Sequence, residues 1–205
     1  MSGQTWPKIG GFERTFDGAG HTISNLNVNV QNLPAGFIGS LDRGGIVKNL
    51  LLVNANISSN AHAGGIVGHL TNSTVIACAV SECKVSGTLY AGGIAGEVKT
   101  EPSSVIACYA TSCDIQGPEN ASGHIAGMGT PNFFSVCFYD GAGNGIPDFQ
   151  SVPEAVEQVR QNDWPVAMGY MDPQLGTHDY QWAMNPDEEA RATLPLVLVP
   201  NPAMQ

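Results

Sequence analysis

The chain contains a repeat of about 28 residues, and this period restricts the fold more than any other feature of the sequence. The repeated motif is Ala-Gly-Gly-Ile-x-Gly, present at Ala63–Gly68 and Ala91–Gly96, with weaker forms at Ala35–Gly39 and Ser122–Gly127. The first glycines of these motifs follow one another at a nearly constant step, at Gly36, Gly64, Gly92 and Gly123. Such spacing indicates structural units stacked on one another. The glycines predict a tight corner or a positive φ in each unit.

Apolar residues between the glycine motifs follow the same step. One series is Leu50, Cys78, Cys108 and Cys137, and another is Ala55, Cys83 and Cys113. Within a unit the apolar positions alternate over short runs, which is a strand signal, and residues 16–146 show no helical stripe. Helical repeats need longer helices, and a propeller blade needs about 40 residues. The sequence therefore predicts an all-β fold, with residues 1–146 forming a parallel β-helix that has one repeat in each coil.

In a β-helix, equivalent residues stack about 4.8 Å apart, so the two cysteine series are predicted to be inward-facing ladders. Cysteine behaves there as a small hydrophobic residue. The parallel direction of stacked side chains does not favour the torsion of a disulfide. Five cysteines are present and none lies in a Cys-x-x-Cys or Cys-x-x-His pair, so the sequence predicts packing rather than zinc binding.

The glycine motif, together with the following Val75-x-x-Cys78 segment, resembles the GLUG repeat of bacterial surface and secreted proteins. The segment 12–26 is similar to the sequence that often precedes those repeats, although Arg14 stands where a glycine is usual. The resemblance covers about residues 10–140. It implies a right-handed β-helical stalk or adhesin-like module, located outside the cell or on its surface. It brings no catalytic residue to this chain.

The glycine rhythm stops near Pro147, and residues 147–205 are predicted to form a C-terminal capping segment. The pattern Ser151-Val-Pro-Glu154 resembles a capping box and predicts a short helix at about 152–162. A solenoid must close its open end to avoid edge-to-edge pairing. We therefore expect Trp164 or Trp182 to pack over the last coil. The alternative is an aromatic platform for a ligand.

Charge and composition exclude some classes of protein. The formal net charge is −10, which argues against a protein that binds nucleic acid by neutralising phosphates. The apolar runs are too short for a transmembrane helix, so no membrane insertion is expected. No signal peptide is visible, and residues 1–15 suggest a domain cut from a longer exported chain, with a cytosolic protein as the alternative.

Two sets of polar residues are candidates for metal sites. The histidines are His21, His62, His69, His124 and His178, and a solenoid could bring His62, His69 and His124 near one another. Solvated side chains are preferred, because no pair has the spacing of ligands on a helix. The loop Asp140–Asp148 offers oxygen ligands but lacks the alternating ligands and closing glutamate of a calcium loop, so a plain turn is preferred. We assign no metal or cofactor.

No catalytic set is visible either. The acidic residues form no in-register pair, and no nucleophile elbow, zinc-protease motif or phosphate loop occurs. The sequence predicts a non-enzymatic module that binds a host glycan or an extracellular protein, or that serves as a spacer. The alternative is a carbohydrate-active module with a groove lined by Tyr90, Tyr109, Phe133 and Tyr139. The sequons at Asn56, Asn72 and Asn120 matter only in a eukaryotic secretory route.

Overall fold

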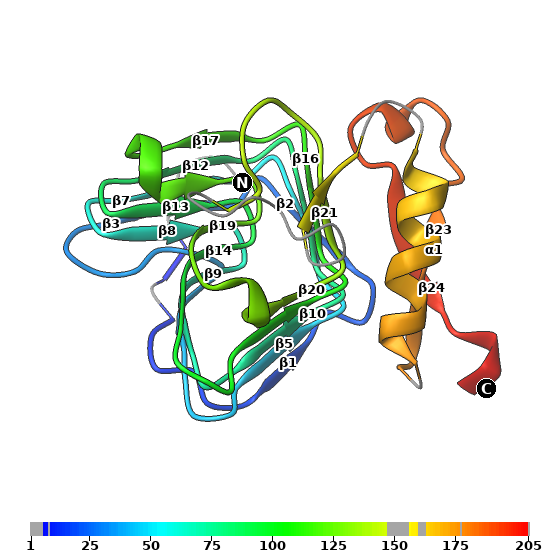
Figure 1. Ribbon diagram of the computed structural model, residues 1–205, viewed down its shortest axis with the longest axis horizontal. Helices are drawn as coiled ribbons and strands as arrows, with labels where there is room; N and C mark the ends of the chain where they lie inside the picture. Colours follow the sequence, from blue (N-terminus) through cyan, green and yellow to red (C-terminus); the bar gives the residue numbers. More distant parts are fainter. Residues whose placement is uncertain (1–5, 8, 147–155, 160–162, 177, 205) are drawn as a thin grey trace.

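The computed structural model describes residues 6–7, 9–146, 156–159, 163–176 and 178–204. The chain winds into about four stacked coils, which confirms the predicted parallel β-helix (Figure 1). Five parallel sheets run along the stack, and each coil adds one strand to most of them. In the described part of the chain, no helix has the length and apolar character needed to cross a membrane.

Sheets 1 to 3 form the first three sides of each coil. Sheet 1 contains β1 (Thr15–Asp17), β5 (Ile46–Lys48), β10 (Thr74–Ile76), β15 (Ser104–Ile106) and β20 (Phe134–Ser135). Sheet 2 contains β2 (Thr22–Ser24), β6 (Leu51–Val53), β11 (Ala79–Ser81), β16 (Tyr109–Thr111), β21 (Cys137–Tyr139) and β22 (Val156–Gln158). Sheet 3 contains β3 (Asn27–Val30), β7 (Asn56–Ser59), β12 (Lys84–Gly87) and β17 (Asp114–Gln116).

Sheets 4 and 5 flank the glycine motif. Sheet 4 contains β8 (His62–Gly64), β13 (Tyr90–Gly92) and β18 (Ser122–Gly123). Sheet 5 contains β4 (Ile38–Leu41), β9 (Val67–Thr71), β14 (Ala95–Lys99) and β19 (Ala126–Met128). Short 3-10 helices lie at Glu119–Ala121 and Pro131–Phe133. No α-helix lies between residues 16 and 146, as the absence of a helical stripe predicted.

The register follows the sequence period. Val75 pairs with Val47 on one side and with Val105 on the other. The first cysteine series is a buried column, in which the backbone N–H of Cys78 donates to the Sγ of Cys108 over 3.4 Å. All five cysteines are free thiols. The first cysteine series therefore packs inward as predicted, and in the second series Cys83 is buried while Cys113 packs against the core and stays partly exposed.

The glycine motif lets two backbone segments approach each other closely, and its glycines are not needed for a positive φ. Gly64 and Gly92 do not lie in the left-handed region, although six other glycines do. A Cβ on Gly64 would lie 2.1 Å from the carbonyl oxygen of Val67 and 2.5 Å from the backbone nitrogen of Gly96. The backbones of sheets 4 and 5 thus meet where a side chain would not fit. Several corners are instead made by left-handed asparagines, including Asn25, Asn54 and Asn72.

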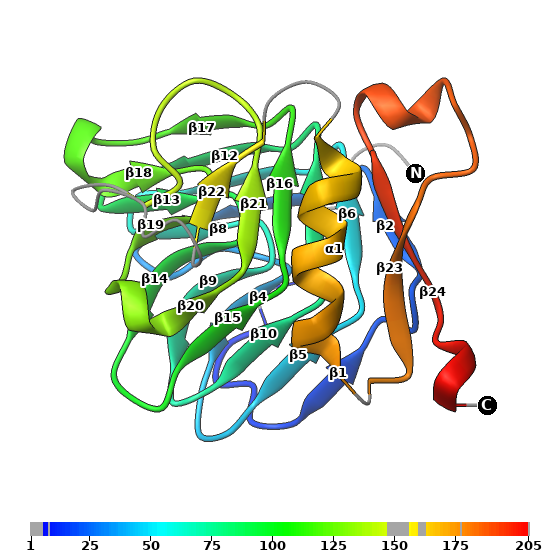
Figure 2. The ribbon, with the colours of Figure 1, turned by 45° about the vertical axis from the view of Figure 1, so that its right-hand side comes forward.

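From Trp164 onward, the C-terminal segment packs beside the solenoid and not over its last coil (Figures 1 and 2). It consists of α1 (Trp164–Leu175) and an antiparallel pair, β23 (Tyr180–Met184) and β24 (Leu196–Pro200), with 3-10 turns at Ala190–Ala192 and Pro202–Met204. Trp182 donates its indole N–H to the carbonyl of Ala107, and the Tyr109 hydroxyl donates to the carbonyl of Leu196. These contacts cover the outer face of sheet 2.

The expected closing role of the tryptophans is therefore wrong. Tyr139, Ile146 and Val156 are the residues that join the solenoid core beyond the fourth cysteine position, and Val156 pairs with Cys137. Trp164 and Trp182 belong to a second hydrophobic cluster between sheet 2 and the C-terminal segment. Both indoles are buried, which also overturns the alternative of an aromatic ligand platform.

The helix predicted at 152–162 is wrong where the structure describes it. Val156–Gln158 forms strand β22, and the remaining predicted positions, apart from Val159, lie outside the described residues. Pairing with the free edge of β21 outweighs the local helix signal there. The helix that does form begins after Asp163, has Pro165 in its first turn, and ends before Gly176 at a φ of 51°.

Candidate functional site

A partly buried polar cluster lies where sheets 4 and 5 meet. The chain passes from β8 to β9 through the glycine motif, which places His62 beside His69 with ring centroids 5.8 Å apart. The next coil adds Tyr90 from β13, whose ring is tilted by 31° against that of His62 with the centroids 5.2 Å apart, and Glu97 from β14. We call His62, His69, Tyr90, Glu97 and Lys99 the arch cluster.

Glu97 is the centre of the arch cluster. Its side chain is only 5% exposed, and its Oε2 lies 3.5 Å from the Nδ1 of His62 and 3.3 Å from the Nε2 of His69. Its Oε1 lies 3.3 Å from the Nζ of Lys99, which is 59% exposed. A buried carboxylate is costly unless it is paired, and here three nitrogen groups from two coils surround it.

The arch cluster also perturbs its own histidines. Burial lowers the pKa of His62 below its ordinary value of 6.5, and the positive charge of Lys99 and the neighbouring His69 act in the same direction, while Glu97 opposes them. This shift favours the neutral imidazole of His62. Its Nδ1 is buried and has no hydrogen-bond partner. The hydroxyl of Thr71 lies 3.2 Å from the Nε2 of His69.

The sequence contains a signal for this cluster that a search for paired acids does not find. Glu97 stands one repeat after His69, and Tyr90 stands one repeat after His62. The structure pairs these residues in register, Glu97 with His69 and Tyr90 with His62. The arch cluster is found by searching for residues of different chemical types that stand one repeat apart, rather than for two carboxylates.

The structure separates His124 from the two histidines of the arch cluster. Its ring stacks on Tyr139 at 5.2 Å, and its Nε2 lies 3.0 Å from the carbonyl oxygen of Ala142. His21 is exposed, and His178 is half-buried within the C-terminal segment, between α1 and β23. Within the described ranges, no three His, Cys, Asp or Glu side chains are arranged to hold a metal ion.

In the loop considered as a calcium site, the first carboxylate forms hydrogen bonds within the protein. Asp140 accepts hydrogen bonds from the Thr111 hydroxyl and from the backbone N–H of Ser112, the latter over 2.6 Å. Asp148 lies outside the described residues. The carboxylate of Asp140 therefore fixes a corner of the solenoid, in keeping with the preferred interpretation as a turn.

The four aromatic residues proposed to line a groove do not share one. Tyr109 is fully buried between Trp164 and Trp182, with centroid distances of 5.1 Å to each. Phe133 and Tyr139 are also buried, and only Tyr90 is partly exposed. The groove expected for a carbohydrate-active module at these residues is absent.

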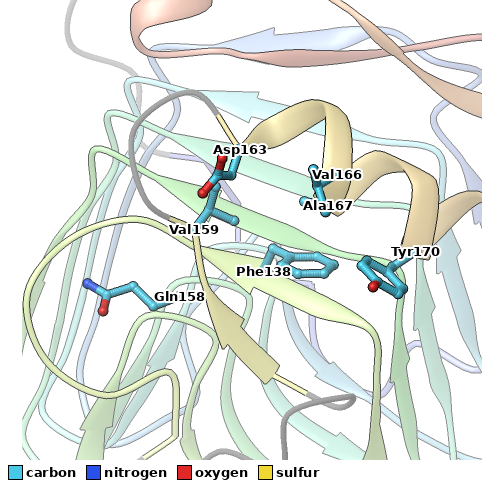
Figure 3. Close-up of a pocket in the computed structure, with 7 residues that line it drawn as sticks. All are labelled: Phe138, Gln158, Val159, Asp163, Val166, Ala167 and Tyr170. Carbon is cyan, nitrogen blue, oxygen red and sulfur yellow. The ribbon is translucent and has the colours of Figure 1, made fainter.

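A different cavity, of about 320 Å³, lies between α1 and the last strands of sheet 2 (Figure 3). Its lining residues are Phe138, Gln158, Val159, Asp163, Val166, Ala167 and Tyr170. Val166 and Tyr170 are among the most exposed large apolar side chains described, at 58% and 61%. Among the described residues, Asp163 supplies the one carboxylate that faces this cavity.

The cysteines are expected to react slowly in the folded protein. Burial raises the pKa of Cys108 and of Cys137 well above the ordinary thiol value, and Cys83 together with burial raises that of Cys113. The hydrogen bond with Cys113 lowers the pKa of Cys83, but that thiol is fully buried. With Ellman's reagent at pH 8, we expect little native labelling and release of five thiol equivalents in denaturant. Fewer than five equivalents without reductant would reveal a disulfide that contradicts the packed ladder.

No known protein family profile matches this chain. Halomucin of Haloquadratum walsbyi (strain DSM 16790 / HBSQ001) is 37% identical over 91 residues, which is 44% of this chain and 1% of halomucin. The crystal structure of a candidate immunoglobulin A1 protease from Bacteroides ovatus has a TM-score of 0.48 at 18% identity, and the alignment covers 84% of this chain and 75% of that one. The chain thus resembles a short stretch of a far longer protein, halomucin.

Proposed function

We propose that this chain is a non-catalytic β-solenoid module of a surface or secreted protein, which presents an adhesin-like face or acts as a spacer. The observation that carries this proposal is the in-register stacking of the coils around a continuous apolar interior. Such a stack gives a rigid element of defined length with flat sides. The resemblance to GLUG repeats and the likeness to a protein named as a mucin support an extracellular location.

The outer face of sheet 3 is the side best suited to an adhesive role. Its two outward columns are polar: Asn27, Asn56, Lys84 and Asp114 form one, and Asn29, Ser58, Ser86 and Gln116 form the other. All eight side chains are exposed or half-buried. Amide and hydroxyl groups on a flat sheet can hydrogen-bond the hydroxyls of a glycan or the backbone of an extracellular protein.

Arrays of glycans and matrix proteins test this proposal. We expect the double variant Asn56→Arg and Ser86→Arg to bind the ligand at least tenfold more weakly than the wild type. The control Val166→Arg, which changes an exposed residue of α1, should keep the wild-type affinity. If no glycan or matrix protein of the panel binds, the spacer role is favoured over the adhesive role. Turnover of any polysaccharide by the purified chain would contradict the non-catalytic assignment.

A further inference from the structure

We propose that the arch cluster is an acid-sensitive latch, which loosens the contact between sheets 4 and 5 when His62 and His69 are both protonated. This inference goes beyond the proposed surface role. It rests on the geometry of one buried carboxylate shared by two imidazoles from consecutive strands of the same coil. The latch spans coils two and three, because Glu97 and Tyr90 come from the coil after His62 and His69.

The groups that face the latch come from every strand around it. β8 contributes His62, β9 contributes His69 with Thr71, β13 contributes Tyr90, and β14 contributes Glu97 with Lys99. The in-register neighbours of His69 and Glu97 on the outer coils are Ser40 and Met128, which carry no charge. Among the described residues, Glu97 is thus the only anion paired with these three basic side chains.

The charge balance of the latch becomes positive on acidification. With both imidazoles neutral, Lys99 and Glu97 sum to zero; with both protonated, the sum is +2 around the same carboxylate. Both imidazoles face the same oxygen of Glu97, so the second proton adds a charge close to an existing imidazolium, with rings 5.8 Å apart. Like charges in a partly buried site disfavour double protonation.

We expect sheets 4 and 5 to separate at the contact between them because of its backbone geometry. Sheets 4 and 5 touch through glycines, and the motif has no side chain there to interlock the two backbones. The polar side chains of the latch lie beside that contact. Repulsion among them therefore acts directly on a contact that is made by backbone atoms.

The sign of the pH effect follows from proton linkage. The pKa of His62 is lower in the folded chain than the ordinary 6.5, so the unfolded chain binds more protons as pH falls. The contribution of His62 to stability is complete above pH 6.5 and is lost as pH falls from there toward the folded value. For each unit by which folding lowers the pKa of His62, the equilibrium constant for folding falls about tenfold at a pH below both the folded and the unfolded pKa.

Hydrogen exchange at pH 7.5 and pH 5.5, corrected for intrinsic rates, tests the latch in the full chain. We expect the amides of Gly65 and Ile66, which donate across coils to Gly93 and Ile94, to lose protection at least tenfold more than the amides of Ala79 and Tyr109 in sheet 2. In the variant His62→Gln with His69→Gln, the extra loss should disappear. The matched control His21→Gln with His178→Gln should keep it. Equal loss in both variants, or uniform loss across the sheets, would overturn the latch.

A second measurement holds even if the double variant fails to fold. The imidazole carbon-bound protons of the wild-type chain can be titrated by NMR. We expect His62 to titrate below the ordinary histidine value of 6.5. Titration of His62 at or above 6.5 would overturn the proposal.

Discussion

Replacement of Gly92 by alanine is expected to destabilise the fold by about 3 kcal/mol or more, a large share of the about 5–15 kcal/mol available to a domain. A Cβ at this position would lie 2.0 Å from the carbonyl oxygen of Ala95 and 2.7 Å from the backbone nitrogen of Gly127. Both atoms belong to the backbone, so no flexible side chain can move aside. Urea unfolding followed by circular dichroism measures the loss.

Gly169→Ala is the matched control for this prediction. Gly169 lies inside α1, and a Cβ there would meet nothing within 4 Å. Alanine favours a helix over glycine, so this variant should be as stable as the wild type or up to about 1 kcal/mol more stable. A wild-type unfolding midpoint for Gly92→Ala would mean that sheets 4 and 5 do not approach each other as described.

Replacement of Trp182 by alanine is expected to cost about 3–5 kcal/mol, the usual range for a buried aromatic residue. Its ring packs on Tyr109, and its indole N–H donates to the carbonyl of Ala107 over 2.9 Å. Without it, the carbonyl of Ala107 loses a partner, and α1 and the β23–β24 pair lose their central contact with sheet 2. Limited proteolysis should then cut the C-terminal segment faster than the coils.

Tyr170→Ala provides the comparison for Trp182→Ala. Tyr170 is 61% exposed on α1, so its removal should change the free energy of unfolding by no more than about 0.5 kcal/mol. If the two variants have the same stability and the same proteolytic pattern, the C-terminal segment does not depend on Trp182 for its attachment to sheet 2.

The repeat predicted the solenoid because, in such a fold, spacing in the sequence determines contact in space. Val47, Val75 and Val105 pair in register as the period requires, and the cysteine series is a buried column. Each coil contacts mainly its neighbours, so a local pattern repeated along the chain contains most of the information about the long-range pairing.

The C-terminal segment was less predictable because it does not repeat. Its position depends on the outer face of sheet 2, where Leu51, Ala79 and Tyr109 form an apolar column. A half-buried strand should place polar residues on that outer face. The apolar column was therefore the sequence feature that indicated an apolar outer face of sheet 2, which another layer of the protein must cover. The helix lies outside its expected position because β21 had a free edge for Val156–Gln158.

The sequence indicated that His62 and His69 could lie near each other, as they do, but it did not predict the rest of the arch cluster, for a different reason. Its members share a repeat step but not a residue type, so a search for columns of like residues passes over His69 and Glu97. The burial of Glu97 depends on the close glycine contact of sheets 4 and 5, which the motif did not reveal by itself.

Scalar couplings across hydrogen bonds measure the stacking of the coils most directly. In a deuterated, isotope-labelled sample, we expect cross-peaks from the amide nitrogens of Ala79, Tyr109 and Phe138 to the carbonyl carbons of Leu50, Cys78 and Cys108, which accept their hydrogen bonds over 2.9, 3.1 and 3.0 Å. Each links one coil to the coil before it. Couplings from these amides to carbonyls near in sequence, or to antiparallel partners, would contradict the solenoid.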